Sequence, residues 1–159
     1  MEEKMPLLKQ PFRFLKQPKK KAVFFAIIGI ILVIAIVVSI SIYNRNYFSR
    51  LVTQMLGEYP FADNAVGKGG RYLKIDTNPY DKEPEDLSVG LAATFYQKQR
   101  DSLNGIEFVN EKLGFPASVY EKMLNTSSIM GMQTAETNKF RVSWTYHPTR
   151  GIEVMYEKK

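Results

Sequence analysis

An apolar run near the amino terminus, residues 22–43, constrains the fold of this chain more than any other feature. The run reads AVFFAIIGIILVIAIVVSISIY and has no charged residue in its 22 positions. A helix of that length is roughly 33 Å long at 1.5 Å per residue, which suffices to cross the ~30 Å hydrocarbon core of a bilayer. The hydroxyls of Ser39 and Ser41 can bond to carbonyls of their own helix. We therefore expect a single transmembrane helix here and not a buried core helix.

The charges on either side of the run predict its orientation. Residues 1–21 form a basic tail with seven Lys or Arg and two Glu, whereas the next twenty residues after the run hold only Arg45 and Arg50 as cations. Cytoplasmic flanks carry the excess of Lys and Arg, so we expect a cytoplasmic amino terminus and an extracytoplasmic carboxyl-terminal part. The topology determinants nearest the helix are Lys16, Lys19, Lys20 and Lys21. The tail is a poor organelle transit peptide, and a bacterial cell membrane is the expected location.

A cleaved signal peptide is the competing interpretation of the same segment. Ser39 and Ser41 are small residues at the spacing that signal cleavage uses. The apolar core is longer than the usual ~7 to 15 residues of a signal peptide. A retained signal anchor is therefore favoured over cleavage.

The rest of the chain is long enough for one small domain. Residues 44–57 are predicted to form a juxtamembrane helical stalk that ends at Gly57, and residues 58–159 an extracytoplasmic α+β domain. The stalk has an apolar stripe, which must be covered by its own domain, a partner helix or the membrane interface. Cover by its own domain is favoured. The stripe consists of Tyr47, Phe48, Leu51, Val52, Met55 and Leu56.

Within the domain, turn formers and apolar spacing predict short elements. A turn-rich segment is expected over 58–70, followed by a strand at 72–75. A first helix is expected from Pro84 towards Arg100, with a strand as its alternative, and a second from Ser102 to Leu113, ended by Gly114. A third helix follows Pro116, and a strand is expected at 129–132.

The carboxyl end has the clearest local pattern. Apolar and polar residues alternate over residues 140–146 and again over 152–157, with HPTRG between them. Period-2 alternation around turn residues is typical of a β-hairpin. With the strand at 129–132, it predicts a three-stranded antiparallel β-meander. The fold class is thus α+β, with one transmembrane helix, short helices and this carboxyl-terminal sheet.

Composition excludes several classes of function. The net charge is +6, but five of these charges lie in the tail, and residues 44–159 have 15 basic and 14 acidic side chains. A nucleic-acid partner is disfavoured, because that binding needs clustered Lys and Arg. No Cys and a single His exclude disulfides, zinc sites and thiol catalysis. We expect no cofactor and no metal.

The acidic residues give only weak indications of chemistry. Those between Asp76 and Asp86 do not fit a calcium loop, because Asp81 stands where that loop requires glycine. A pair of carboxylates acting on envelope polymers stays open as an alternative, since their spacing is decided in three dimensions. His147 lies in the hairpin turn and is expected to be an exposed polar residue rather than a base.

Aromatic residues supply the candidate interaction surface. Tyr and Trp are enriched at protein interfaces, and the hairpin places Trp144, Tyr146, His147 and Arg150 in sequence proximity. Core packing is the favoured interpretation of Trp144 and Tyr146, with an exposed aromatic face or an open edge strand as the alternative.

Together these features predict a non-catalytic, single-pass membrane protein whose extracytoplasmic domain binds an envelope protein or an extracellular ligand. Its expected partners are the lipid bilayer and another membrane or envelope protein, and homo-oligomers are compatible with the sequence. The alternatives are a membrane-anchored, carboxylate-dependent enzyme and a transmembrane sensor that signals through the tail.

Overall fold

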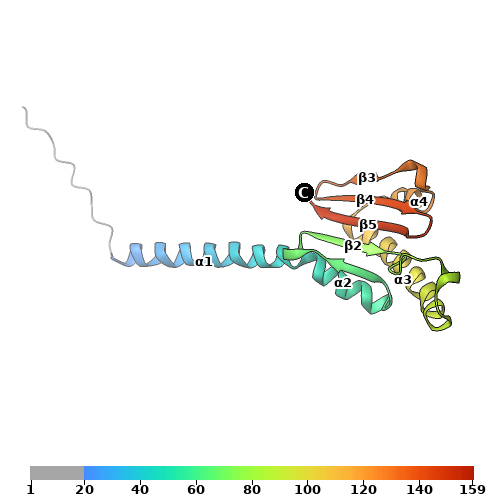
Figure 1. Cartoon of the computed structure of the whole chain (residues 1–159). Coiled ribbons are helices and arrows are strands. Elements are labelled where there is room, and N and C mark those ends of the chain that lie inside the picture. Colours follow the sequence, from blue (N-terminus) through green and yellow to red (C-terminus); the bar gives the residue numbers. More distant parts are fainter. Residues whose placement is uncertain (1–19) are drawn as a thin grey trace, which may run out of the picture. The chain divides into compact units, whose positions relative to one another are not determined.

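The computed structural model describes residues 20–159, in two units that divide between Ile40 and Ser41. The described part of the first unit is the beginning of α1 (Lys20–Arg45), a single helix whose side chains from Ala22 to Ile40 are exposed (Figure 1). The segment Ala22–Arg45 is long and apolar enough to cross a membrane, and a signal sequence would have the same properties. Lys16 and Lys19 of the basic tail lie outside the described residues.

The predicted stalk packs into the second unit, residues 41–159. A single residue, Asn46, separates α1 from α2 (Tyr47–Glu58). Its N–H donates to the Ile42 carbonyl (3.2 Å) and its own carbonyl accepts from the Arg50 N–H (3.1 Å), so backbone hydrogen bonds join it to both helices. Phe48 and Met55 on α2 are fully buried in the core of the domain. The apolar stripe is therefore covered by its own domain, which is the alternative that the sequence favoured.

The sheet has five antiparallel strands in the order β1-β2-β5-β4-β3. The predicted hairpin is confirmed, with Trp144 opposite Val154, and the α+β class is confirmed with it. The predicted three-stranded meander accounts for three of the five strands. The sheet continues beyond it because β2 pairs with the other edge of β5, although the two strands are some eighty residues apart in sequence. The strands are β1 (Asp63–Val66), β2 (Tyr72–Asp76), β3 (Gln133–Glu136), β4 (Phe140–His147) and β5 (Gly151–Lys158).

One helix replaces the two predicted between Pro84 and Leu113. A 3-10 turn, η2 (Pro84–Asp86), precedes a continuous α3 (Val89–Leu113). The prediction of a break at Ser102 was wrong, because the Ser102 hydroxyl accepts a hydrogen bond from another segment instead of capping its own helix. Gly114 ends α3 in the left-handed conformation (φ 76°), as predicted. The predicted helix after Pro116 is α4 (Ala117–Leu124).

The strand predicted at 129–132 was also wrong. A 3-10 turn, η3 (Ser128–Met130), occupies this place, and β3 starts only at Gln133. Gly131 has a φ of 62° and redirects the chain between the two. The apolar residues that suggested a core strand are exposed.

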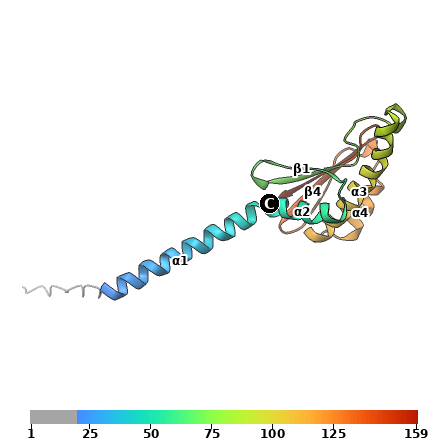
Figure 2. The same cartoon turned by 90° about the horizontal axis from the view of Figure 1, so that it is seen from below.

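The core lies between the sheet and the helices, which cover one face of it (Figure 2). Leu73 and Ile75 of β2 and Tyr156 of β5 are fully buried against the helices. The Tyr156 hydroxyl lies 3.1 Å from Asn110 Oδ1 and 3.2 Å from the Ile106 carbonyl, so β5 is bonded to α3 through the core. Burial raises the pKa of Tyr156 far above its ordinary value. This tyrosine is a structural hydrogen-bond donor.

Candidate interaction surfaces

The predicted interaction residues do not form one surface. Trp144 is 3 % exposed, and its Nε1 donates a 2.8 Å hydrogen bond to Thr126 Oγ1. A buried indole needs such an acceptor, and the segment after α4 supplies it. Trp144 is therefore a core residue, and its assignment to the candidate surface is corrected.

The other three residues lie at or near the β4–β5 turn. Tyr146 is half-buried against the core, whereas His147 is exposed with its Nδ1 3.0 Å from Thr149 Oγ1. Arg150 is exposed and lies 3.4 Å from Asp81 Oδ1. The structure thus brings His147 and Arg150 to one solvated turn, where Arg150 pairs with Asp81 and the imidazole contacts Thr149.

The segment after β2 holds this turn in place. The buried Asn78 side chain donates 2.6 Å and 2.9 Å hydrogen bonds to the carbonyls of Thr149 and Lys82. Asp76 Oδ1 accepts a hydrogen bond from the backbone N–H of Asn78. Polar residues between Asp76 and Asp86 therefore stabilise the β4–β5 turn. The residues described from Lys20 onward contain no cluster of three side chains that could hold a metal ion.

Asp76 is a carboxylate whose pKa is changed by its surroundings. Burial raises its pKa above the ordinary value of 3.8, in spite of Lys74 Nζ at 3.6 Å. Lys74 pairs more closely with Glu153, at 2.5 Å, and that hydrogen bond is the main cause of its own raised pKa. The lysine is shared between two acids on the solvent-facing side of the sheet, so it compensates Asp76 only in part.

A hollow of ≈ 240 Å³ between α3 and α4 is lined by three glutamates, and it is a candidate for the carboxylate pair that the sequence left open. The carboxylates are those of Glu107, Glu111 and Glu121, and the wall includes Phe115 and Tyr120. All three carboxylates are exposed. General acids in carboxylate-based hydrolysis are held in apolar, desolvated surroundings, so this hollow is better suited to attract a cation than to transfer a proton.

An exposed apolar edge beside β3 is a feature that the sequence did not predict. Ile129 is 93 % exposed and Met132 69 %, and Met130 and Leu124 lie exposed in the same segment. Among the residues that the structure describes, β3 pairs with β4 alone, so its other edge is open. We call Leu124, Ile129, Met130, Met132 and β3 together the η3–β3 edge. The sequence signal was the polar residues Thr126 to Ser128 and Gly131 around the apolar ones, which indicate a turn rather than a core strand.

Comparison with known proteins found no family model, no curated protein and no solved structure that matches this chain.

Proposed function

We propose that this chain is a non-catalytic, single-pass membrane protein whose extracytoplasmic domain binds another envelope protein through the η3–β3 edge. The observation that carries the proposal is the exposure of three large apolar side chains, Ile129, Met130 and Met132, within four residues beside an open strand. Contiguous apolar side chains of this kind are typical of sites that a partner covers.

The membrane anchor is supported by the first described unit. Its side chains from Ala22 to Ile40 are exposed and uncharged, which is stable only if lipid or other apolar matter covers them. The excess of cations before the helix supports a cytoplasmic amino terminus, and the length of the apolar core supports retention over cleavage.

The partner would add an extended segment to β3. Strand addition uses backbone hydrogen bonds along an open edge and pockets or apolar contacts for alternate side chains. Here alternate residues of the four-residue strand β3 (Gln133–Glu136) point their backbone N–H and C=O groups away from β4, and the preceding turn offers the apolar contact. A partner strand with apolar residues at one end fits this arrangement.

Photo-crosslinking tests the proposal in the full-length chain in its native membrane. A photoreactive residue is placed at position 129 or 132, with position 89 as the control, because Val89 is an equally exposed apolar residue (91 %) on α3. We expect the same protein to be captured from 129 and 132 and not from 89.

The captured protein is then purified and its affinity for the chain measured. Ile129→Asp should weaken binding at least tenfold without changing the stability of the domain, since this side chain has almost no contacts to lose. Identical products at all three positions, or unchanged affinity of the variant, would contradict the proposal. Capture of a second copy of this chain would replace the envelope partner by a homo-oligomer.

The three glutamates of the α3–α4 hollow are the observation behind a second candidate, an anchored enzyme that acts on envelope polymers, in which the bound polymer would have to desolvate one of the carboxyl groups. Its test is release of soluble fragments from purified cell-envelope polymer by the full-length chain. Release that disappears in Glu111→Gln and persists in Glu85→Gln, a change at an exposed acid outside the hollow, would support the enzyme over the binding module.

A further inference from the structure

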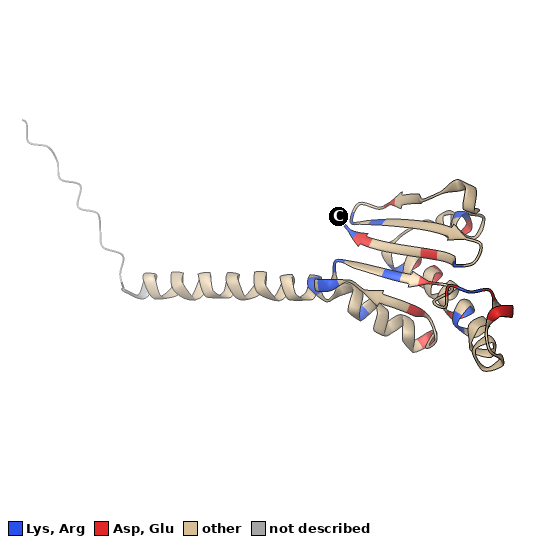
Figure 3. Ribbon diagram, in the orientation of Figure 1, with Lys and Arg blue, Asp and Glu red and all other residues tan. Residues whose placement is uncertain are grey.

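The domain has almost no net charge, but its basic and acidic side chains are concentrated in different regions. Of its 15 basic side chains, eight lie around the end of α1, with only two carboxylates among them, Glu136 and Glu157. That group has a charge of +6, and the rest of the domain, with seven basic and twelve acidic side chains, has −5. In Figure 3, Lys and Arg lie near the α1–α2 junction and at the end of the sheet where the chain terminates. Asp and Glu lie mainly at the opposite end of the sheet. We call this group the basic collar: Arg45, Arg50, Lys68, Arg71, Lys139, Arg141, Lys158 and Lys159.

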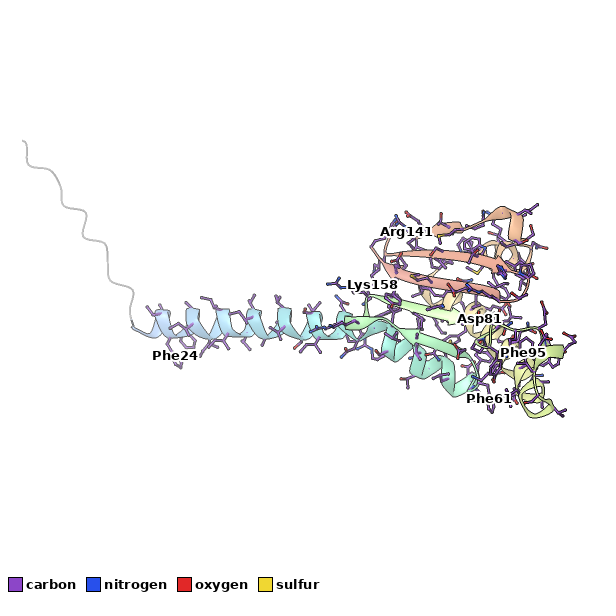
Figure 4. All side chains as sticks on the ribbon, in the orientation of Figure 1. Phe24, Phe61, Asp81, Phe95, Arg141 and Lys158 are labelled. Atoms are coloured by element: carbon purple, nitrogen blue, oxygen red, sulfur yellow. The ribbon has the colours of Figure 1, made fainter. Side chains whose placement is uncertain are left out.

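Four segments that are distant in sequence build the collar. Gly70, in η1 (Lys68–Gly70), lies so close to α1 that an added Cβ would be 2.0 Å from the Arg45 carbonyl oxygen. Lys158, near the end of β5, donates through Nζ to the Asn44 carbonyl. In Figure 4, Lys158 and Arg141 lie at the same end of the sheet, with Asp81 and Phe95 at the other.

The surface of the collar is hollowed between these segments. A depression of ≈ 530 Å³ is lined by Arg45, Arg71 and Lys158 together with the glycines of η1, and by one acid, Glu157. A second, of ≈ 480 Å³, is lined by Lys139, Lys158 and Lys159 with Tyr43, Tyr47 and Phe140. Both open to solvent, so an anionic group can reach several cations at once.

Most of the collar cations lack an acidic partner. Within the domain from Ser41 on, eight basic side chains have no carboxylate within 4.0 Å, and six of these eight belong to the collar. Arg141 and Lys159 share Glu136, at 2.7 and 2.6 Å. Unpaired like charges repel one another and destabilise the fold, and an external anion would remove that cost.

Two tyrosines lie at the collar where α1 enters the domain. The Arg50 guanidinium lies 3.5 Å from the centre of the exposed Tyr43 ring, and Lys158 Nζ lies 5.5 Å from that of Tyr47. Tyrosine is enriched at the level of lipid headgroups, where it accompanies basic residues that contact phosphate.

We propose that the basic collar binds the phosphate groups of anionic lipid headgroups in the leaflet beside the domain. The proposal rests on the proposed membrane anchor. Arg45 is only five residues beyond Ile40, the last residue of the apolar unit, so the collar is tied to the bilayer surface by the chain itself. Each cation near an anionic surface contributes about fivefold in affinity.

Native mass spectrometry of the full-length chain in detergent tests the proposal, with phosphatidylglycerol and phosphatidylcholine as the lipid probes. The variant is Lys68→Gln with Lys139→Gln, and the matched control is Lys82→Gln with Lys122→Gln. All four lysines are exposed, none of them has a carboxylate of the described residues within 4.0 Å, and only the first two belong to the collar. Both double variants lose two charges, so they differ only in where the charge is removed.

We expect the wild type and the control to prefer phosphatidylglycerol, and the collar variant to bind it about 25-fold more weakly, which is two losses of about fivefold. Equal affinity in both double variants would overturn the proposal. Displacement of the lipid by millimolar inorganic phosphate would show a general phosphate site and would also overturn it.

A separate measurement, alkaline extraction, tests the proposed membrane anchor. If alkaline extraction releases the chain from native membranes, the anchor is wrong. If the chain resists extraction and still shows no preference for phosphatidylglycerol, the collar proposal alone is wrong.

Discussion

The hydroxyl of Ser102, inside α3, accepts a 2.9 Å hydrogen bond from the backbone N–H of Asp63, the first residue of β1. The neighbouring Asp101 carboxylate accepts another, of 3.1 Å, from the N–H of Phe61. Both bonds join the helix to the chain about forty residues earlier and hold the segment that leads into the outermost strand. Asp101 and Ser102, two residue types that often cap helices, therefore connect α3 to the chain at the start of β1.

Ser102→Ala should destabilise the domain by about 1–3 kcal/mol, because it leaves the Asp63 N–H without its buried acceptor. Unfolding of the full-length chain in detergent can be followed by the fluorescence of Trp144, the single tryptophan. Ser118→Ala, an exposed serine in α4, is the control and should change little. Equal effects of the two substitutions would disprove the structural role of the hydrogen bond.

Trp144 and Thr126 should be energetically coupled through their buried hydrogen bond. Trp144→Phe and Thr126→Val each remove one partner, and the double variant should lose about 1 kcal/mol less than the sum of the single losses. Chemical denaturation followed by the near-ultraviolet circular dichroism of the tyrosines measures all four proteins. Strict additivity would mean that the bond contributes nothing.

Gly70→Ala should cost about 2–4 kcal/mol, because the position has a φ of 66° and a Cβ would collide with the Arg45 carbonyl. The control is Gly57→Ala in α2, where a Cβ would meet nothing within 4 Å. Thermal unfolding compares the two variants. If Gly70→Ala were as stable as the control, η1 would not contact α1 as described.

Asp76 should make the stability depend on pH in an unusual direction. Because burial raises its pKa in the folded state above 3.8, the folded chain binds more protons than the unfolded chain just above that pH. Its contribution to the free energy of unfolding therefore falls as pH rises through this window, and the cost persists above the folded pKa.

Asp76→Asn removes this titration. Its stability relative to the wild type should be constant below about pH 4, rise as pH increases to the folded pKa of Asp76, and stay constant above it. Denaturation series from pH 3 to 8 test it, with Asp86→Asn, an exposed acid in η2, as the control. A relative stability that falls with pH would show that pairing with Lys74 outweighs burial.

Local patterns predicted the elements whose signals are contained in a few neighbouring residues. The hairpin of β4 and β5 follows from period-2 alternation around a turn, and the end of α3 follows from Gly114. The predictions failed where a side chain is used by a distant segment, as at Ser102, or where exposed apolar residues resembled a strand, as at Ile129. Propensity and spacing contain no information about such partners.

The candidate site shows the same division. The sequence indicated an aromatic surface on the hairpin, and the structure buries Trp144 while it exposes the η3–β3 edge. Strand β1, too short and polar to be recognised within the turn-rich segment, is in the sheet because it pairs with β2.

The sequence by itself determined the apolar helix, its basic flank and the net charge of the domain, because these are properties of composition along the chain. It could not determine how that charge is arranged. Fifteen basic and fourteen acidic side chains are nearly balanced in sum, yet folding places most unpaired cations around the end of α1. Only the tertiary structure decides this separation, because packing of η1, the β3–β4 turn and the end of β5 against one helix end fixes where their charged side chains meet.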